Sequence, residues 1–353
     1  MRATRELPGR LIATGIPGPQ LDAATRRALE DLAPSGIVLF ARNITDVAQL
    51  RHLTGALHAL PCRPLVAIDH EGGRVMRLGP PFTQFPTAAV VGRGGASAAH
   101  AVGRAMGLEL ASVGIDIDYA PVLDVQSNPA NPIVGDRAFS QDALTAAALA
   151  VAFMRGLHSA GVLPCGKHFP GHGGTDRDSH LELPVVRRSR AELEATELVP
   201  FRAAIAGGLP LLMTAHVCYP ALDSEHSATL SPAILRTLLR DQLGFRGVVL
   251  TDDLTMGAVR ATSSIPEAAI AALRAGADWL LVCHDLDEAH RVAERIRIGL
   301  KRGELAADAV AESANRIARL SGLLHRSAPL ILPVAAHRAL AERLRGMVAD
   351  PPA

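Results

Sequence analysis

The chain has 353 residues, with 36 basic and 35 acidic side chains, so its formal net charge is +1. This balance argues against a nucleic-acid-binding or membrane-surface protein, because both need a concentrated basic face. Hydrophobic residues make up 48% of the chain and charged residues 20%, which excludes a disordered protein and allows a large core. Aromatic residues make up only 3%, which leaves few stacking platforms for a polysaccharide and favours a small ligand held by polar groups.

The first expectation concerns the compartment. Four cysteines lie far apart and form no CxxC motif, namely Cys62, Cys165, Cys218 and Cys283. In a chain of this length such cysteines are typical of buried thiols in a reducing compartment. The N-terminal apolar stretch is short and broken by Gly and Pro, and no run reaches the roughly 18 apolar residues of a membrane span. We therefore expect a cytoplasmic monomer with no nucleic-acid and no membrane partner.

Short apolar runs alternate along the chain with longer amphipathic stretches, and each run is typical of a buried parallel strand. The eight predicted strands cover residues 11–14, 36–40, 65–68, 116–120, 162–166, 211–214, 247–250 and 279–282. Eight strands with intervening helices over about 290 residues predict an α/β fold, a (β/α)8 TIM-type barrel. A doubly wound sheet is the second possibility, but no Gly-rich phosphate loop follows the first strand.

Helix-start signals fall between these runs. They are Thr45 or Asp46, Ser97 before a helix over 98–113, the capping boxes Ser189-x-x-Glu192 and Ser264-x-x-Glu267, and Ser231 followed by Pro232. Two more helices are expected after about residue 306. We therefore predict one catalytic barrel domain over residues 1–353, with its core at about 10–300 and a helical tail at about 305–348.

Several predicted strands end on titratable side chains. These are Asp69 after the third strand, Lys167 and His168 after the fifth, His216 after the sixth, and Asp252 and Asp253 after the seventh. The loops over 70–96, 121–140 and 167–188 are long, and long loops on one face of a barrel usually build its site. In a barrel these strand ends and loops share the C-terminal face, where active sites lie.

The segment 167–180, KHFPGHGGTDRDSH, has the densest chemistry. It holds three of the 14 histidines, two Asp, one Arg and one of only two lysines. A solvated loop would explain the Gly and Pro residues but not the crowded histidines. Two kinds of site fit: acid–base chemistry without metal, or a metal site built on His168, His172, Asp176, Asp178 and His180.

The pattern KHFPGHG-x-T-x-x-DSH resembles the signature of the bacterial β-N-acetylglucosaminidases of glycoside hydrolase family 3, which are single-domain cytoplasmic enzymes of peptidoglycan recycling. Other segments agree with the same family, in order, over residues of about 10–285. They are GIVLFARN at 36–43, AIDHEGGRVMR at 67–77, DYAPVLDV at 118–125, NPIVGDRAF at 131–139, MTAHVCYPALD at 213–223 and LGFRGVVLTDDLTMGAV at 243–259. The departures are His70, where the family often has Gln, and Thr251, where it often has Ser.

The resemblance implies a retaining exo-β-N-acetylglucosaminidase that removes terminal non-reducing N-acetylglucosamine from cytoplasmic muropeptides (GlcNAc-anhydroMurNAc peptides). It implies a covalent glycosyl-Asp intermediate, with no cofactor and no metal. Asp252 matches the family's nucleophile, His180 its proton donor and acceptor, and Asp178 the carboxylate that orients His180. The residues themselves say only that neighbouring strand positions face opposite ways, so that one of Asp252 and Asp253 aims at the barrel centre.

A second set of positions matches the family's sugar-binding residues, namely Asp69, Arg77, Arg137, Lys167 and His168. We assign His216 and Met256 to the pocket wall, and expect His172 to order its loop and His70 to alter a contact near the sugar. The expected partner is a small muropeptide or amino sugar. Three alternatives stay open: a metal-dependent hydrolase, an N-acetylglucosaminide phosphorylase, and a sugar-binding barrel without catalysis.

Overall fold

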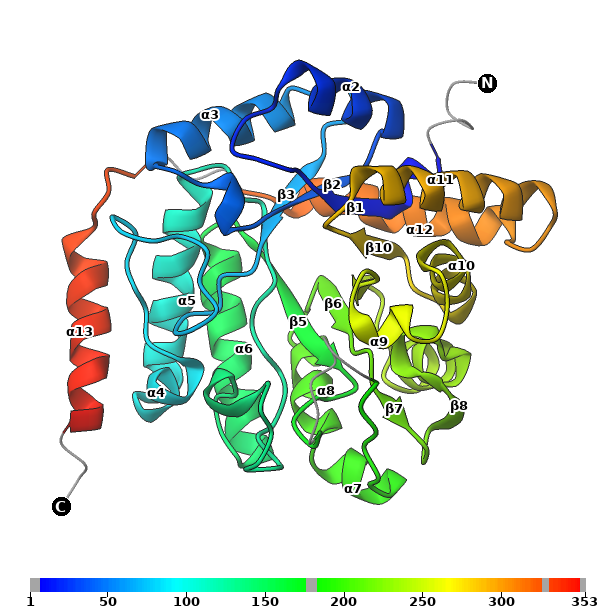
Figure 1. Cartoon of the computed structure of the whole chain (residues 1–353). Coiled ribbons are helices and arrows are strands. Elements are labelled where there is room, and N and C mark those ends of the chain that lie inside the picture. The colour runs from blue at the N-terminus through cyan, green and yellow to red at the C-terminus, as the bar shows by residue number, and fades with distance from the viewer. Residues whose placement is uncertain (1–6, 176–182, 326–329, 350–353) are drawn as a thin grey trace.

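The computed structural model describes residues 7–175, 183–325 and 330–349. Eight parallel strands close into a barrel in the order β1-β10-β9-β6-β5-β4-β3-β2. The strands are β1 (Ile12–Gly15), β2 (Gly36–Leu39), β3 (Leu65–Ile68), β4 (Ile117–Asp118), β5 (Leu163–Phe169), β6 (Leu211–Thr214), β9 (Val248–Asp253) and β10 (Trp279–Val282). Each coincides with or overlaps one predicted strand, so the predicted (β/α)8 architecture is confirmed (Figure 1).

The strands are apolar on both sides because helices cover the barrel outside and side chains fill it inside. Every residue of β1, β2, β3, β6 and β10 is buried. Trp279 is the largest fully buried side chain. Gly36 makes room for it, since a Cβ atom at Gly36 would lie 2.3 Å from the Trp279 ring.

The helices surround the barrel as Figure 1 shows, with α5 and α6 packed side by side. They are α2 (Ala23–Leu32), α3 (Val47–His58), α4 (Ala88–Arg93), α5 (Gly95–Ala111), α6 (Ala143–Ser159), α7 (Arg190–Ala195), α8 (Leu198–Ala206), η5 (Ala233–Gln242), α9 (Gly257–Arg260), α10 (Ile265–Ala275), α11 (Leu286–Lys301), α12 (Ala307–Leu320) and α13 (Ala335–Ala349). Short helical turns are η1 (Gly9–Leu11), η2 (Ala41–Asn43), η3 (Gly135–Arg137), η4 (Ala228–Leu230) and η6 (Ser321–Leu323). Two helices thus follow residue 306, as predicted.

Most predicted helix starts are confirmed. Asp46 accepts the Gln49 N–H at 2.9 Å, the Ser189–Glu192 capping box is formed, and the Ser231 hydroxyl accepts the Ile234 N–H at 3.1 Å. Two predictions are wrong. Ser264 occupies the N-cap position of α10 but makes no capping hydrogen bond, and Ser97 lies inside α5.

The Ser97 prediction failed because α5 follows α4 without an intervening loop. Gly94 is both the C-cap residue of α4 and the N-cap residue of α5, so α5 begins at Gly95. The sequence also did not predict an antiparallel pair of short strands, β7 (Cys218–Tyr219) and β8 (Asp223–Ser227). Among the helices of the described residues, none has the length and hydrophobicity needed to cross a bilayer.

Candidate active site

A cavity of about 210 Å³ opens at the C-terminal ends of the barrel strands. Its walls combine charged strand-end residues with apolar side chains. It is lined by Val38, Phe40, Asp69, Glu71, Val75, Arg77, Tyr119, Ile133, Arg137, Lys167, His168, His172, Met213, Asp252, Asp253, Met256, Leu281, Cys283 and His284. Of the predicted site residues within the described part of the chain, the structure therefore brings together Asp69, Arg77, Arg137, Lys167, His168 and Asp252.

Two strands deliver neighbouring residues to the same cavity. Between β5 and β6 the register shifts, since Gly166 pairs with Leu212 and Phe169 with Thr214. Three steps along β5 thus face two along β6, which is the signature of a β-bulge. The bulge contains Lys167 and His168, and both side chains line the cavity.

The same device recurs between β9 and β10. Leu250 pairs with Trp279 and Asp253 with Leu281, so β9 carries one extra residue. The Thr251 hydroxyl accepts the Leu281 N–H at 3.0 Å inside this irregularity. Asp252 and Asp253 both line the cavity as a result. The expectation that only one of them faces it was wrong, because strict alternation holds only in a regular strand.

The two aspartates nevertheless differ in their contacts. The Asp253 Oδ1 accepts the Thr255 N–H at 3.0 Å and the Cys283 N–H at 3.4 Å, which ties it to the end of β10. Asp252 accepts the N–H of Asp253 at 2.8 Å. Burial raises the pKa of the Asp253 carboxyl. Burial opposes ionisation of Asp252 too, but the charges of His216, His168 and Lys167 and the hydrogen bond from the Asp253 N–H outweigh it and lower the pKa of Asp252.

The charged side chains of the cavity form a chain of ion pairs. The Lys167 Nζ lies 2.7 Å from the Asp69 Oδ1 and 2.6 Å from the Glu71 Oε1. Arg137 binds both Glu71 oxygens, each at 2.8 Å. The Arg77 guanidinium lies 3.6 Å from the other Asp69 oxygen. Glu71 thus holds two cations in fixed positions, while Asp69 lies between Lys167 and Arg77.

Burial by itself would neutralise these groups, but the pairing reverses its effect. Only 2% of the Lys167 side chain and 5% of the Glu71 side chain are exposed. Burial lowers the pKa of Lys167, yet Asp69 and Glu71 raise it by more. Burial raises the pKa of Glu71, yet Arg137 and Lys167 lower it by more. Lys167 and Glu71 are therefore both charged at neutral pH.

A buried carboxylate orients His168. The Asp124 Oδ2 lies 2.8 Å from the His168 Nδ1, and the Asp124 Oδ1 accepts the backbone N–H groups of His168 and His172 at 3.1 and 2.7 Å. The ionised carboxylate accepts the Nδ1 proton, which leaves Nε2 as the ring atom available to the cavity. His172 pairs through its Nδ1 with the Thr175 hydroxyl at 2.9 Å, in agreement with a loop-ordering contact.

His216 and His70 lie outside the cavity lining, in contrast to expectation. Met256 lines the cavity, but His216 lies behind it, bonded to the Thr229 hydroxyl at 2.8 Å and to the Asp253 carbonyl at 3.2 Å. His70 is 2% exposed and does not line the cavity. Its Nδ1 accepts the Arg77 N–H at 3.3 Å, so it supports the loop that carries Arg77 instead of contacting a ligand.

Asp178 and His180, the predicted acid–base pair, lie outside the described residues, as does Asp176. The predicted metal set therefore contributes only His168 and His172 to the described structure. Within residues 7–175, 183–325 and 330–349, no group of three or more His, Cys, Asp or Glu side chains is arranged to hold a metal ion.

Sequence reasoning missed two residues of this site, Glu71 and Asp124. Each had a weak signal. Glu71 lies two positions after Asp69 in the segment that leaves β3, and Asp124 lies in the long segment that leaves β4. Glu71 pairs with Lys167 and Asp124 pairs with His168, about 40 to 100 positions further along the chain, and only barrel closure brings these partners together.

Comparison with known proteins places this geometry in context. The model of the glycosyl hydrolase family 3 N terminal domain matches residues 6–320. A beta-hexosaminidase of Neisseria meningitidis is 40% identical over 301 residues, which is 83% of this chain and 83% of that protein. The structure of NagZ from Neisseria gonorrhoeae in complex with N-trifluoroacetyl-D-glucosamine has a TM-score of 0.82 at 33% identity, covering 96% of this chain and 98% of that one. A family 3 beta-N-acetylglucosaminidase from Paenibacillus has a TM-score of 0.92 at 34% identity, covering 96% of this chain and 68% of that one.

Proposed function

Because the chain belongs to glycosyl hydrolase family 3 and is a β-N-acetylhexosaminidase, we propose that it removes single terminal N-acetylglucosamine residues from small muropeptides in the cytoplasm, with retention of configuration. The observation that carries this proposal is the grouping of Asp252 with the Asp69–Lys167–Glu71–Arg137 ion-pair chain in one cavity. The cavity, at about 210 Å³, is smaller than those that hold drug-sized ligands, about 300–1,000 Å³. It therefore suits one sugar residue and not a polymer.

Asp252 is the nucleophile in this proposal. A retaining glycosidase needs an ionised carboxylate on one face of the sugar, which attacks the anomeric carbon while the leaving oxygen is protonated. The lowered pKa of Asp252 keeps it ionised at neutral pH, and the groups responsible are His216, His168, the Asp253 N–H and Lys167, acting against burial. Asp253 suits this role less well, because its Oδ1 is tied to the Thr255 and Cys283 N–H groups and burial raises its pKa.

The ion-pair chain holds the sugar. Asp69 has one oxygen 2.7 Å from Lys167, and its carboxylate is partly exposed to the cavity, so it can accept hydrogen bonds from sugar hydroxyls. Lys167 is a compact donor that Arg does not replace well. Arg77 and Arg137 add planar donors from neighbouring loops. Because these groups are already fixed by each other, binding requires little further ordering of side chains.

For the acid–base step, we assign His180 as proton donor and Asp178 as its orienting carboxylate, on the family resemblance of the segment 167–180. Among the three described histidines that line the cavity, His168, His172 and His284, the competitor is His168, because it has the shortest carboxylate contact, 2.8 Å to Asp124. The two assignments differ in leaving-group dependence. Loss of the true donor slows substrates with poor leaving groups far more than nitrophenyl substrates, because poor leaving groups need the proton in the transition state.

His180→Ala and His168→Ala variants separate these assignments. We expect His180→Ala to show the steep leaving-group dependence and to lose one limb of the pH profile of kcat/KM. His168→Ala should raise KM and slow all substrates by one factor. The reverse pattern would transfer the donor role to His168, and would leave the nucleophile and the hydrolase assignment in place.

The reaction itself is tested with p-nitrophenyl N-acetyl-β-D-glucosaminide and with the disaccharide of a muropeptide. We expect release of free N-acetylglucosamine, at the same rate with or without phosphate and after treatment with a chelator. N-Acetylglucosamine 1-phosphate as product would show a phosphorylase, and loss of turnover after chelation a metal-dependent enzyme. Binding without turnover would show a sugar-binding barrel.

Substrate size gives a second test of the same proposal. Initial rates on muropeptide disaccharide should far exceed those on polymeric chitin at equal concentrations of chain ends, because the cavity holds one sugar. Release of short oligosaccharides from the middle of chitin chains would contradict exo action.

A further inference from the structure

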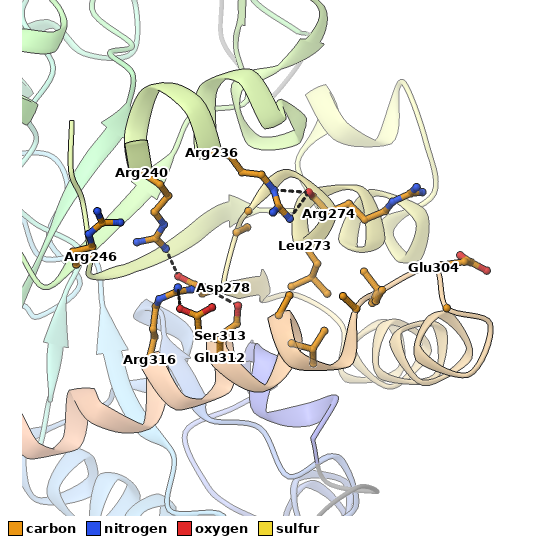
Figure 2. A pocket seen from close by; sticks show the side chains of 17 residues that line it. Arg236, Arg240, Arg246, Leu273, Arg274, Asp278, Glu304, Glu312, Ser313 and Arg316 are labelled. Carbon is orange, nitrogen blue, oxygen red and sulfur yellow. Dashed lines mark hydrogen bonds and ion pairs between the residues drawn. The ribbon is translucent and has the colours of Figure 1, made fainter. Parts of the chain in front are cut away.

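A second and larger cavity has a volume of about 470 Å³ and is drawn in Figure 2. It lies at the opposite end of the barrel, because its lining includes Arg246 and Asp278, which come before β9 and β10. It is enclosed by η5, by the segment from α10 to the start of β10, and by the first turns of α12. Asp278 stands directly before β10 and forms part of its wall. The cavity shares no residue with the cavity that holds Asp252.

Arginines dominate this cavity. Five line it, Arg236, Arg240, Arg246, Arg274 and Arg316. Three acidic residues also line it, Asp278, Glu304 and Glu312, which leaves an excess of two positive charges. In Figure 2 the Arg274 side chain and Glu304 lie at the far end, away from Asp278, so the excess remains two around Asp278 itself.

Asp278 is already saturated by protein groups. Its Oδ2 accepts Arg240 at 2.6 Å and the Val249 N–H at 2.9 Å, and its Oδ1 accepts Arg316 at 2.8 Å and the Ser313 hydroxyl at 2.7 Å. This network fastens α12 to the N-terminal end of the barrel, the barrel floor. It explains Arg240 and Arg316, but it has no use for Arg246 or Arg236.

Arg236 and Arg246 have no carboxylate partner among the described residues. Within the described residues Arg246 has no ion pair, and Arg236 donates to the Arg274 backbone carbonyl at 2.9–3.1 Å without a carboxylate partner. Burial lowers the pKa of Arg240 and the nearby Arg316 and Arg246 lower it further, so these like charges repel one another even with Asp278 present. A bound anion would relieve that repulsion.

The other half of the cavity is apolar, with Leu273, Ala277, Leu305, Ala309 and Val310 in its wall. A ligand that fits both halves carries a doubly charged head and a compact organic part. A phosphate monoester has a charge of about −1.5 to −2 at neutral pH, and its oxygens match the planar guanidinium fork. We infer that this cavity binds a small phosphate monoester, with the phosphate against Arg246, where Arg240 and Arg316 add further positive charge, and the organic part against the apolar wall.

The test is isothermal titration of the whole protein with phenyl phosphate, and separately with inorganic phosphate and with phenol. We expect one saturable site for phenyl phosphate, weaker binding of inorganic phosphate and none of phenol. Arg246→Ala should reduce the affinity about tenfold or more, because it removes a charged donor. Arg274→Ala is the matched control and should change affinity less than about twofold, since that side chain points away.

The titrations are repeated in saturating N-acetylglucosamine, which fills the cavity at the other end of the barrel. The inference predicts an unchanged affinity for phenyl phosphate. Displacement by the sugar, equal losses in Arg246→Ala and Arg274→Ala, or no saturable binding would each overturn it. Circular dichroism confirms folding of both variants; Arg246 is exposed and has no ion pair among the described residues, so its loss leaves the Asp278 network intact.

Discussion

The two ends of this barrel use charge in opposite ways. At the C-terminal end, the residues lining the cavity include four carboxylates, Asp69, Glu71, Asp252 and Asp253, against three cations. At the N-terminal end, five arginines face three carboxylates. The first cavity thus has an acidic excess, which suits a reaction whose transition state gains positive charge on the sugar. The second has a basic excess, which suits an anion.

The two ends also differ in where their charged groups originate. The charged side chains at the C-terminal end come from strand ends and from the loops after them. Two bulges place consecutive residues in one cavity there, Lys167 with His168 and Asp252 with Asp253. Floor charges come mainly from helices, with Asp278 as the common acceptor. Substitution at the C-terminal end should therefore affect turnover, and substitution of Asp278 should affect stability.

The largest effect is expected for Asp252→Asn. Loss of the proposed nucleophile should reduce kcat by at least about 10⁴-fold, while the free energy of unfolding changes by less than about 1 kcal/mol. Asp253→Asn is the matched control. It should keep measurable turnover and lose stability instead, because its carboxylate holds the Thr255 and Cys283 N–H groups. If Asp253→Asn were inactive and Asp252→Asn nearly normal, the nucleophile would be Asp253.

The second effect is expected for Asp278→Ala at the barrel floor, where stability should fall and turnover should not. Asp278→Ala leaves Arg240 and Arg316 without their buried partner, which should cost about 4 kcal/mol of unfolding free energy in urea. Turnover at 25 °C should stay within about twofold of the parent value, because no catalytic group changes. A large fall in kcat with unchanged stability would show that the two ends are not separable.

The third effect joins stability to binding. Glu71→Gln keeps the shape of the side chain but removes the charge that holds Lys167 and Arg137. We expect a loss of about 3 kcal/mol in unfolding free energy and a rise in KM of about tenfold. Glu267→Gln provides the control, since its pair with Arg295 is exposed and should contribute less than about 1 kcal/mol. Equal losses in the two variants would contradict the buried ion-pair account.

The smallest effect concerns pH. Burial is the main cause that lowers the pKa of His70 from 6.5 to about 4. As the pH falls, the His70 side chain is therefore protonated in the unfolded chain before it is protonated in the folded protein. The contribution of neutral His70 to the free energy of unfolding is present above pH 6.5 and is lost as the pH falls toward 4. Between pH 7 and pH 5 the loss should be about 2 kcal/mol. His70→Gln should remove that part of the slope in denaturant titrations. His172, whose pKa is also lowered to about 4, keeps its own part. An unchanged slope in His70→Gln would show that His70 does not contribute.

The apolar runs predicted the barrel well because a strand buried on both faces needs an unbroken apolar segment, as in β3 and β10. The barrel prediction likewise placed Asp69, Lys167, His168 and Asp252 at one end of the barrel, and all four line the cavity. Local patterns failed where tertiary pairing decides. Alternation along β9 predicted that Asp253 would face away from the cavity if Asp252 faced it, but the bulge against β10 turned both residues toward the cavity.

Residues whose role depends on a distant partner were also missed. Glu71 and Asp124 stand in segments without a periodic pattern. Asp124 matters because β4, the strand before it, lies beside β5. Glu71 matters because barrel closure brings the segment after β3 within reach of Lys167 on β5, across β4. His216 was placed on the cavity wall because it follows β6, yet its hydrogen bonds to Thr229 and the Asp253 carbonyl hold it behind that wall. Neither partner can be read from the residues around position 216.

The central claim is that Asp252 forms a covalent bond to the sugar, and trapping tests it most directly. The protein is incubated with a fluorinated N-acetylglucosaminide that forms the glycosyl-enzyme faster than it hydrolyses, and is then digested with trypsin. The label should lie on the peptide of residues 247–260, and fragmentation should place it on Asp252. A label on Asp253 or on another peptide, or no adduct from a reagent that still inactivates the protein, would contradict the account.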